Sequence, residues 1–185
     1  MIRRDGPRNV PVMNTHIHFD IGSSTLGRVL VASNDKGICA ILLGDSAQAM
    51  ARELQARFPG DRLTRDRERL ATPLRQAVEF ADGHVASLDL PLDASGTEFQ
   101  RRVWRALRRI PAGATASYAQ IARLIEAPRS FRAVAQACGA NPIALAIPCH
   151  RVVRNDGALS GYRWGVARKR RLLENERHLQ REARR

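Results

Sequence analysis

The chain has 185 residues, a hydrophobic content of 44% and a formal net charge of +13 at pH 7. This length suits one large domain or two small ones. No apolar run is long enough to span a membrane, and three cysteines without paired spacing exclude a disulfide framework and a four-cysteine zinc site. We therefore expect a reduced, cytoplasmic protein without membrane contact.

The charge is unevenly distributed along the chain. Residues 1–93 carry twelve Lys or Arg and twelve Asp or Glu, whereas residues 94–185 carry nineteen and six. Because the whole net charge lies in the second half, that half is predicted to bind a polyanion. The alternative is a solvated basic surface that ends in an unstructured basic tail at residues 179–185.

The first half, residues 16–93, is predicted to be a small α/β domain. Residues 1–15 show little periodicity and are expected to form a loose leader. Apolar and polar residues alternate over residues 16–43 in the manner of three strands, and Asn-Asp-Lys-Gly at 34–37 has hairpin-turn chemistry. These strands predict a small antiparallel sheet.

Two helices and a returning strand are expected to complete this domain. Ser46 can cap the first helix, which ends before Pro59. The second helix is predicted over about residues 72–81 from its apolar spacing. Alternation over residues 88–92 predicts a fourth strand, and the domain boundary is expected at residues 93–96.

The second half, residues 94–178, is predicted to be mostly helical. Thr97 and Ser117 each begin a capping-box pattern, with a glutamine three residues later. Ser130 can cap another short helix, and two short helices joined by a turn form a helix-turn-helix candidate. Many helical hairpins bind no nucleic acid, so this prediction depends on the basic charge. A last helix is expected over about residues 166–178.

The most informative motif is Pro-Cys-His-Arg-Val at residues 148–152, which follows an apolar run. A thiolate, and not a thiol, is the nucleophile in cysteine chemistry, and an adjacent base and positive charge favour the thiolate. Pro148 fixes its own φ and removes one donor, so Cys149 is held on a bent segment. The alternative is a buried structural cysteine at the end of a strand.

This motif resembles the active-site signature of the O6-alkylguanine-DNA alkyltransferases, which move an alkyl group from guanine onto their own cysteine. Residues 37–44 and 161–165 resemble the carboxy-terminal half of the bacterial Ada protein. The resemblance extends over nearly the whole chain. Further segments in the family's order are Ser-Tyr-Ala-Gln-Ile-Ala at 117–122, Arg-Ala-Val at 132–134, Asn-Pro at 141–142 and Leu-Leu-Glu-Asn-Glu at 172–176.

The resemblance implies a ribonuclease H-like amino-terminal domain and a helical, winged-helix-like carboxy-terminal domain with a helix-turn-helix. It implies a monomer that acts on double-stranded DNA containing alkylated guanine, without a cofactor. The expected reaction is irreversible transfer of a methyl or larger alkyl group to Cys149 from O6-alkylguanine, and less readily from O4-methylthymine. Each molecule acts once, because the product thioether is stable.

The resemblance also implies catalytic roles for five residues. Cys149 is the nucleophile, His150 is linked to it by a water, and Glu176 lies on the far side of the imidazole. Tyr118 reaches the flipped base, and Asn141 braces the active-site turn. From the residues alone, a surface histidine, an ordinary helical glutamate and a core tyrosine are the alternatives.

Contacts with DNA and the substrate pocket follow from the same resemblance. Arg132, on the second helix of the motif, is expected to fill the gap left by the flipped nucleotide, although a solvated helix arginine is the alternative. Trp164 stands where many relatives have glycine and is expected to crowd a benzyl group. The other expected DNA contacts are Tyr118, Ser130, Ala133 and Arg151, and the other expected pocket residues are Pro148, Val152, Tyr162 and Arg163.

No metal site is predicted. Some relatives hold zinc in the first half through cysteines and histidines, but Cys39 is the only cysteine there. His16, His18 and His84 leave weak zinc binding open. Ada's cysteine-rich, gene-activating module has no counterpart, so repair without transcriptional control is expected. Two rival functions are a lesion-binding relative that lacks the cysteine and a helix-turn-helix transcription factor.

Overall fold

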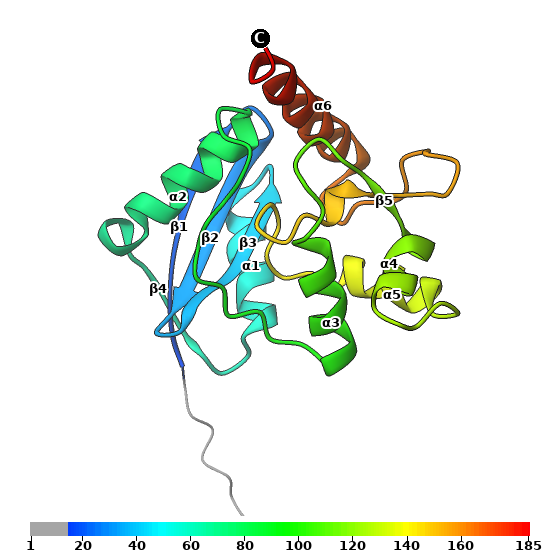
Figure 1. The fold of residues 1–185 in the computed structure, drawn as a ribbon. Coiled ribbons are helices and arrows are strands. Elements are labelled where there is room, and N and C mark those ends of the chain that lie inside the picture. Colours follow the sequence, from blue (N-terminus) through cyan, green and yellow to red (C-terminus); the bar gives the residue numbers. More distant parts are fainter. Residues whose placement is uncertain (1–14) are drawn as a thin grey trace, which may run out of the picture.

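The computed structural model describes residues 15–185 and places a sheet-containing half beside a helical half (Figure 1). The predicted leader lies outside the described residues, apart from Thr15. The last helix, α6 (Val166–Glu182), lies across the top of the view in Figure 1. Within residues 15–185, no helix is both long and apolar enough to cross a membrane.

Four strands form one sheet in the order β3-β2-β1-β4. β1 with β2 and β2 with β3 are antiparallel, as predicted, and the side chain of Asn34 accepts two backbone hydrogen bonds in the hairpin turn. β4 is parallel to β1, so the sheet is mixed, although the α/β class is confirmed. The strands are β1 (His16–Ser24), β2 (Gly27–Asn34), β3 (Gly37–Gly44) and β4 (Arg62–Arg65).

The prediction of a full strand over residues 88–92 is wrong. Leu92 forms only an isolated parallel bridge with Ile38. The N–H of Ile38 donates to the carbonyl of Pro91, and the N–H of Asp93 donates back to the carbonyl of Ile38. Pro91 has no N–H, so it interrupts any continuous ladder. The fourth strand is β4, in a segment between two helices for which the sequence pattern predicts no strand.

Two helices pack on the sheet. α1 (Ala47–Arg57) contacts β3, and α2 (Arg67–Asp82) lies along β1 and β2 (Figure 1). The side chain of Ser46 accepts a backbone hydrogen bond at the start of α1, which confirms the predicted cap. α2 begins ahead of the predicted start because Asp66 caps it, and Pro73 consequently lies inside the helix.

The helical half contains the predicted helix-turn-helix, formed by α4 and α5. Both predicted capping boxes are present, at Thr97 before α3 and at Ser117 before α4. Ser130 precedes α5, but contrary to the prediction its side chain makes no capping hydrogen bond to the described residues. The three helices are α3 (Glu98–Leu107), α4 (Tyr118–Leu124) and α5 (Phe131–Gly139).

α6 is longer than predicted and joins the two halves. It continues to Glu182, so the predicted tail begins inside the helix. Arg168 donates to the carbonyl of Leu26 at 2.7 Å, and Asn175 donates to the carbonyl of Ala81 at 3.2 Å. The helical half also holds a short parallel pair of strands, β5 (Ala116–Ser117) and β6 (Val152–Val153).

Candidate active site

Cys149 follows a segment that the sheet holds in place. Backbone hydrogen bonds of 3.1 and 2.9 Å join Ile41 of β3 to Pro142 and Ala144. The chain then forms a short 3₁₀ helix, η1 (Cys149–Arg151), and Cys149 is buried. The nucleophile candidate therefore depends on the first half of the molecule for its position, although it belongs to the second.

Asn141 braces both ends of this segment. It is fully buried, and its side-chain oxygen accepts the N–H of Ile143 at 2.9 Å. Its side-chain N–H₂ donates to the carbonyl of Ile147 at 2.8 Å and to Sγ of Cys149 at 3.2 Å. A single amide thus fixes the loop and supplies a hydrogen bond that favours the thiolate.

His150 and Glu176 form a buried pair behind the cysteine. Nε2 of His150 lies 2.8 Å from Oε1 of Glu176, and neither side chain is more than 3% exposed. Burial lowers the pKa of His150, although the neighbouring carboxylate opposes this. The imidazole is therefore neutral near pH 7, with Nε2–H donating to Glu176. The other ring nitrogen, Nδ1, is a buried acceptor without a hydrogen-bond partner in residues 15–185.

Arg151 binds the same carboxylate. Its Nε and Nη2 donate to Oε1 of Glu176 at 3.0 and 2.8 Å, and Nη1 donates to the carbonyl of Ile110 at 2.5 Å. The N–H of Gly113 donates to Oε2 at 2.9 Å. Burial raises the pKa of Glu176, but its hydrogen bonds and charge interactions with His150 and Arg151 outweigh burial and lower the pKa to about 2.

The position of Arg151 corrects the expectation that it contacts DNA. Its side chain is 8% exposed, and its guanidinium is engaged by Glu176 and Ile110. A guanidinium that is buried in a bidentate ion pair is not exposed on the surface, where a DNA phosphate would bind. Arg151 instead holds Glu176 in place as a charged partner of the His150 pair.

Lys169 is a buried cation that the sequence analysis did not single out. It is fully buried on α6, and its Nζ donates to the carbonyl of Val152 and to Oγ of Ser160. Burial raises the pKa of Cys149 to about 11, and the hydrogen bond from Asn141 and the charge of Lys169 act in the opposite direction. The resting thiol is therefore protonated near pH 7. α6 is rich in arginine, and its local sequence pattern gives no signal that its single lysine points inward.

Cys149 opens into a cavity of about 390 Å³ between the helix-turn-helix and the loop at residues 160–163. Tyr118 lies on one side of it, with its hydroxyl 2.6 Å from Oγ of Ser160. Because Lys169 also donates to Ser160, three polar groups form a connected chain at the cavity wall. The lining residues are Tyr118, Ala135, Cys138, Gly139, Cys149, Ser160, Gly161, Tyr162 and Arg163.

The cavity contains only part of the expected substrate pocket. Tyr162 and Arg163 line it, whereas Pro148, Val152 and Trp164 do not. Trp164 is 5% exposed and packs behind Tyr162, with the ring centroids 5.1 Å apart. Any effect of Trp164 on a bound alkyl group therefore passes through Tyr162. The sequence analysis missed Cys138 and Ser160, which carry no signal beyond their place beside the family motifs.

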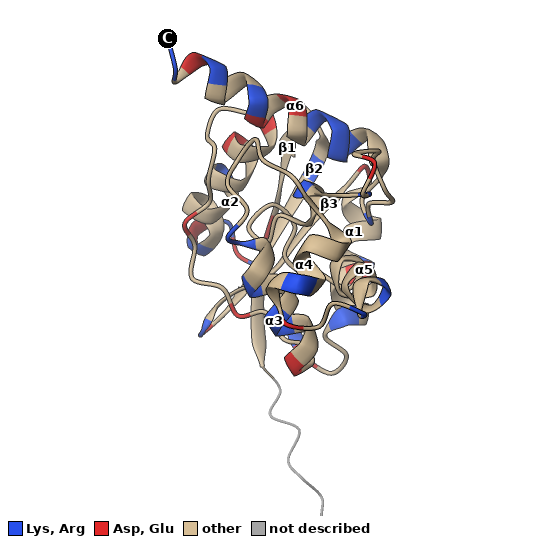
Figure 2. Cartoon of the chain, turned by 45° about the vertical axis from the view of Figure 1, so that its right-hand side comes forward, with Lys and Arg blue, Asp and Glu red and all other residues tan. Residues whose placement is uncertain are grey.

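The expected DNA contacts other than Arg151 lie together on the helix-turn-helix. Ser130, Arg132 and Ala133 occupy the start of α5, and Tyr118 begins α4. The guanidinium carbon of Arg132 lies 5.7 Å from the centroid of the exposed Phe131 ring. Lys and Arg mark α3, α4, α5 and α6 in Figure 2. These helices therefore carry many basic residues, and Phe131 is an exposed aromatic residue at the start of α5.

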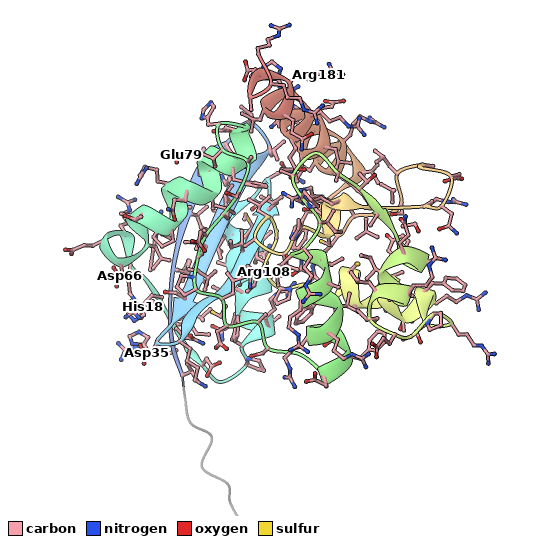
Figure 3. The ribbon with its side chains drawn as sticks, in the orientation of Figure 1. His18, Asp35, Asp66, Glu79, Arg108 and Arg181 are labelled. Carbon is pink, nitrogen blue, oxygen red and sulfur yellow. The ribbon has the colours of Figure 1, made fainter. Side chains whose placement is uncertain are left out.

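Two of the three histidines considered for metal, His16 and His18, make other contacts. Nε2 of His16 lies 2.8 Å from Oγ1 of Thr64, and Nδ1 of His18 lies 3.0 Å from a carboxylate oxygen of Asp66. Figure 3 shows His18 and Asp66 at the outer edge of the sheet, away from α3–α5. In the part of the chain that the structure describes, no group of three or more His, Cys, Asp and Glu side chains could hold a metal ion.

Comparison with known proteins agrees with this arrangement. Residues 17–94 match the ribonuclease-like domain of 6-O-methylguanine DNA methyltransferase, and residues 98–178 match its DNA binding domain. The methylated-DNA–protein-cysteine methyltransferase of Methanosarcina barkeri is 38% identical over 160 residues, which are 86% of this chain and 97% of that protein.

Two further relatives extend the comparison. The regulatory protein ada of Salmonella typhimurium is 50% identical over 88% of this chain, which spans only 46% of that protein. A crystal structure of Mycobacterium tuberculosis OGT in complex with DNA has 35% sequence identity and a TM-score of 0.74, and covers 88% of this chain and 93% of that one. The site and these similarities together place the chain in the O6-methylguanine-DNA methyltransferase family.

Proposed function

We propose that the chain repairs DNA by transferring a methyl or larger alkyl group from O6 of guanine, and less readily from O4 of thymine, to Sγ of Cys149. The observation that carries this proposal is a cysteine that faces a cavity while a buried amide donates to its sulfur and a His–Glu pair lies behind it. Two of the relatives are named methylated-DNA–protein-cysteine methyltransferases, which supports transfer of a methyl group from DNA to a cysteine.

The thiol must lose its proton before it attacks. Because the pKa of Cys149 is raised, a base has to receive that proton during the reaction. His150 follows Cys149 in the chain, and its Nδ1 can accept a proton. We expect the thiol proton to reach Nδ1 through a bridging water. The low pKa of Glu176 keeps its carboxylate charged, so it stabilises the imidazolium that forms.

The base also needs a proton donor. When the S–C bond forms and the O6–C bond breaks, the electron pair of that bond stays with guanine as an anion. Burial raises the pKa of the Tyr118 phenol, so the phenol keeps its proton and can donate it to the base. Loss of that proton leaves a negative charge on the phenol oxygen of Tyr118. The hydrogen bond between Tyr118 and Ser160, and the positive charge of Lys169 on the far side of Ser160, then stabilise this oxygen.

The cavity also explains why the target base has to leave the duplex. Cys149 is buried at the cavity wall and is out of reach of a stacked base. Enzymes that act on a base extrude it at a cost of a few kcal/mol. Arg132 at the start of α5 is suited to fill the space left in the stack, and the excess of basic residues supplies phosphate contacts that do not depend on sequence.

One experiment separates this function from its rivals. Purified chain is mixed with a duplex that holds one O6-methylguanine, and the protein is then weighed and mapped by mass spectrometry. Gain of one methyl on Cys149, equal in moles to the lesion lost, is the expected result. Binding of the lesion without methyl gain would indicate a non-catalytic lesion-binding protein, and preference for one operator sequence would indicate a transcription factor.

A further inference from the structure

Phe131 is exposed without a structural reason for it. Its relative exposure is 46%, and it is one of three large hydrophobic residues that are exposed in the described part of the chain. It stands at the first position of α5, beside Arg132, and its ring is outside the set of side chains packed on the core. Single exposed apolar residues are common on protein surfaces, so it is the position of this ring beside Arg132 on the helix-turn-helix that points to a binding contact.

The ring of Phe131 contacts Arg132 and favours one position of its side chain. The guanidinium carbon lies 5.7 Å from the ring centroid, within the range of a cation–π interaction. An arginine that enters a base stack loses rotamer freedom, and a partner that restricts the side chain beforehand reduces that loss. The two side chains therefore form one preassembled unit.

The surroundings fit duplex DNA as the occupant. Between residues 118 and 139 the chain has three arginines, Arg123, Arg129 and Arg132, against one acidic residue, Glu126. Apolar side chains flanked by basic residues are the wedges by which proteins enter the minor groove and open a base step. An aromatic face adds stacking on a base of any sequence, which suits a protein that searches for damage and not for an operator.

We propose that Phe131 and Arg132 act as a two-residue wedge in the minor groove. Arg132 occupies the space of the extruded nucleotide, and Phe131 stacks on the neighbouring base and keeps the step open. Phe131 is thus a positioning residue that acts only when the substrate is a duplex. This proposal rests on the function proposed above and on the role of Arg132 within it.

The test compares two substrates in single-turnover reactions. Phe131→Ala is expected to slow methyl transfer from duplex O6-methylguanine by about tenfold, the order of one lost stacking contact, and to leave the reaction with the free O6-methylguanine base unchanged. Phe131→Leu, which keeps an apolar side chain without the aromatic face, should give an intermediate rate. Leu124→Ala removes the other exposed hydrophobic residue of the motif and should leave both rates unchanged.

A double-substitution cycle tests whether the pair is one unit. If Arg132 depends on Phe131 for its position, the two substitutions should not act independently. The loss of duplex repair rate in the double variant Phe131→Ala, Arg132→Ala, expressed as free energy, should then be smaller than the sum of the losses in the two single variants. Strictly additive losses, or equal slowing of the duplex and free-base reactions by Phe131→Ala, would overturn the wedge. Failure of the wild-type chain to gain methyl would instead overturn the proposed function, so the two failures are distinguishable.

Discussion

Several arginines in the sheet half are paired with carboxylates, whereas within residues 15–185 the three arginines of the helix-turn-helix are not. Arg65 binds Asp20 at 2.7 Å and Arg75 binds Glu79 at 3.2 Å in the first half. Within residues 15–185, Arg129 and Arg132 form no ion pair with a carboxylate. The paired arginines of the first half stabilise its own surface, whereas the unpaired arginines of the helix-turn-helix leave their charge available for a polyanion.

The two halves also differ in the surroundings of their cysteines. Cys39 lies in a buried strand of the first half, and Cys149 lies at the wall of a cavity in the second. Yet the first half is more than a passive support, because Ile41 pairs with the segment before Cys149 and Glu53 binds Arg163 at the cavity.

Replacement of the two cysteines should give the largest difference. Cys149→Ala is expected to abolish methyl transfer while DNA binding persists, because neither phosphate contacts nor base extrusion uses the sulfur. Cys39→Ala should keep transfer, since burial raises the pKa of that thiol to about 12 and keeps it protonated. Mass mapping after reaction with methylated duplex measures both outcomes. Methyl on Cys39 or Cys138 in the Cys149→Ala protein would contradict the assignment.

Loss of the Glu176 carboxylate should destabilise the helical half. Glu176→Gln leaves Arg151 buried beside a neutral amide, and breaking a buried ion pair in this way costs about 3–5 kcal/mol. The folded pKa of Glu176 is about 2 against a usual 4.5, so its contribution is complete above pH 4.5 and declines as the pH falls towards 2. His150, whose pKa is lowered mainly by burial, adds a decline below its usual pKa of 6.5.

Urea unfolding at several pH values tests this account. The difference in free energy of unfolding between wild type and Glu176→Gln should be largest near pH 6 and should shrink as the pH approaches 2. The rate of methyl transfer should also fall, since the imidazolium loses its partner. A difference in stability that stays constant from pH 6 to pH 2 would show that the carboxylate charge is not the cause.

The motif residues and three of the helix caps could be predicted from the sequence, because both depend on local spacing, whereas the cap predicted at Ser130 is absent and the cap at Asp66 was missed. The capping boxes at Thr97 and Ser117 and the turn at Asn34 are examples. The parallel pairing of β4 depends on contacts between distant segments, which no local pattern records. The inward turn of Arg151 and Lys169 was missed for the same kind of reason, since the partners that bury them lie elsewhere in the chain.

Removal of one arginine from each half should give a smaller and unequal effect on DNA binding. Arg129→Ala is expected to weaken binding several-fold and to reduce the slope of log affinity against log salt by about one, the value for one phosphate contact. Arg75→Ala in α2 should leave the slope unchanged, because its guanidinium is engaged by Glu79. Anisotropy titrations of an undamaged duplex at several salt concentrations measure both. Equal slopes for the two variants would remove the distinction between the halves.

The smallest effect is expected where the halves meet at the cavity. Arg163 lines the cavity, and its guanidinium donates to Glu53 of α1 at 2.8 Å and to the carbonyl of Gly139 at 3.3 Å. Partly exposed ion pairs of this kind contribute about 0.2–1 kcal/mol. Glu53→Gln should therefore alter stability little but allow Arg163 to move. The rate with O6-benzylguanine should rise up to several-fold relative to the rate with O6-methylguanine.

Glu79→Gln is the matched control for this last effect. Glu53 also pairs with Arg57 four residues along α1, and both Glu53 and Glu79 are 34% exposed. Glu79 likewise pairs with an arginine at helical spacing, but it lies on α2, and its partner Arg75 is not a cavity residue (Figure 3). Its ratio of benzyl to methyl rates should equal that of the wild type. If both variants leave the ratio unchanged, Arg163 is fixed by the second half alone. In that case the sheet half would influence the cavity only through the backbone pairing at Ile41, and larger alkyl groups would be excluded by Tyr162 and the loop itself.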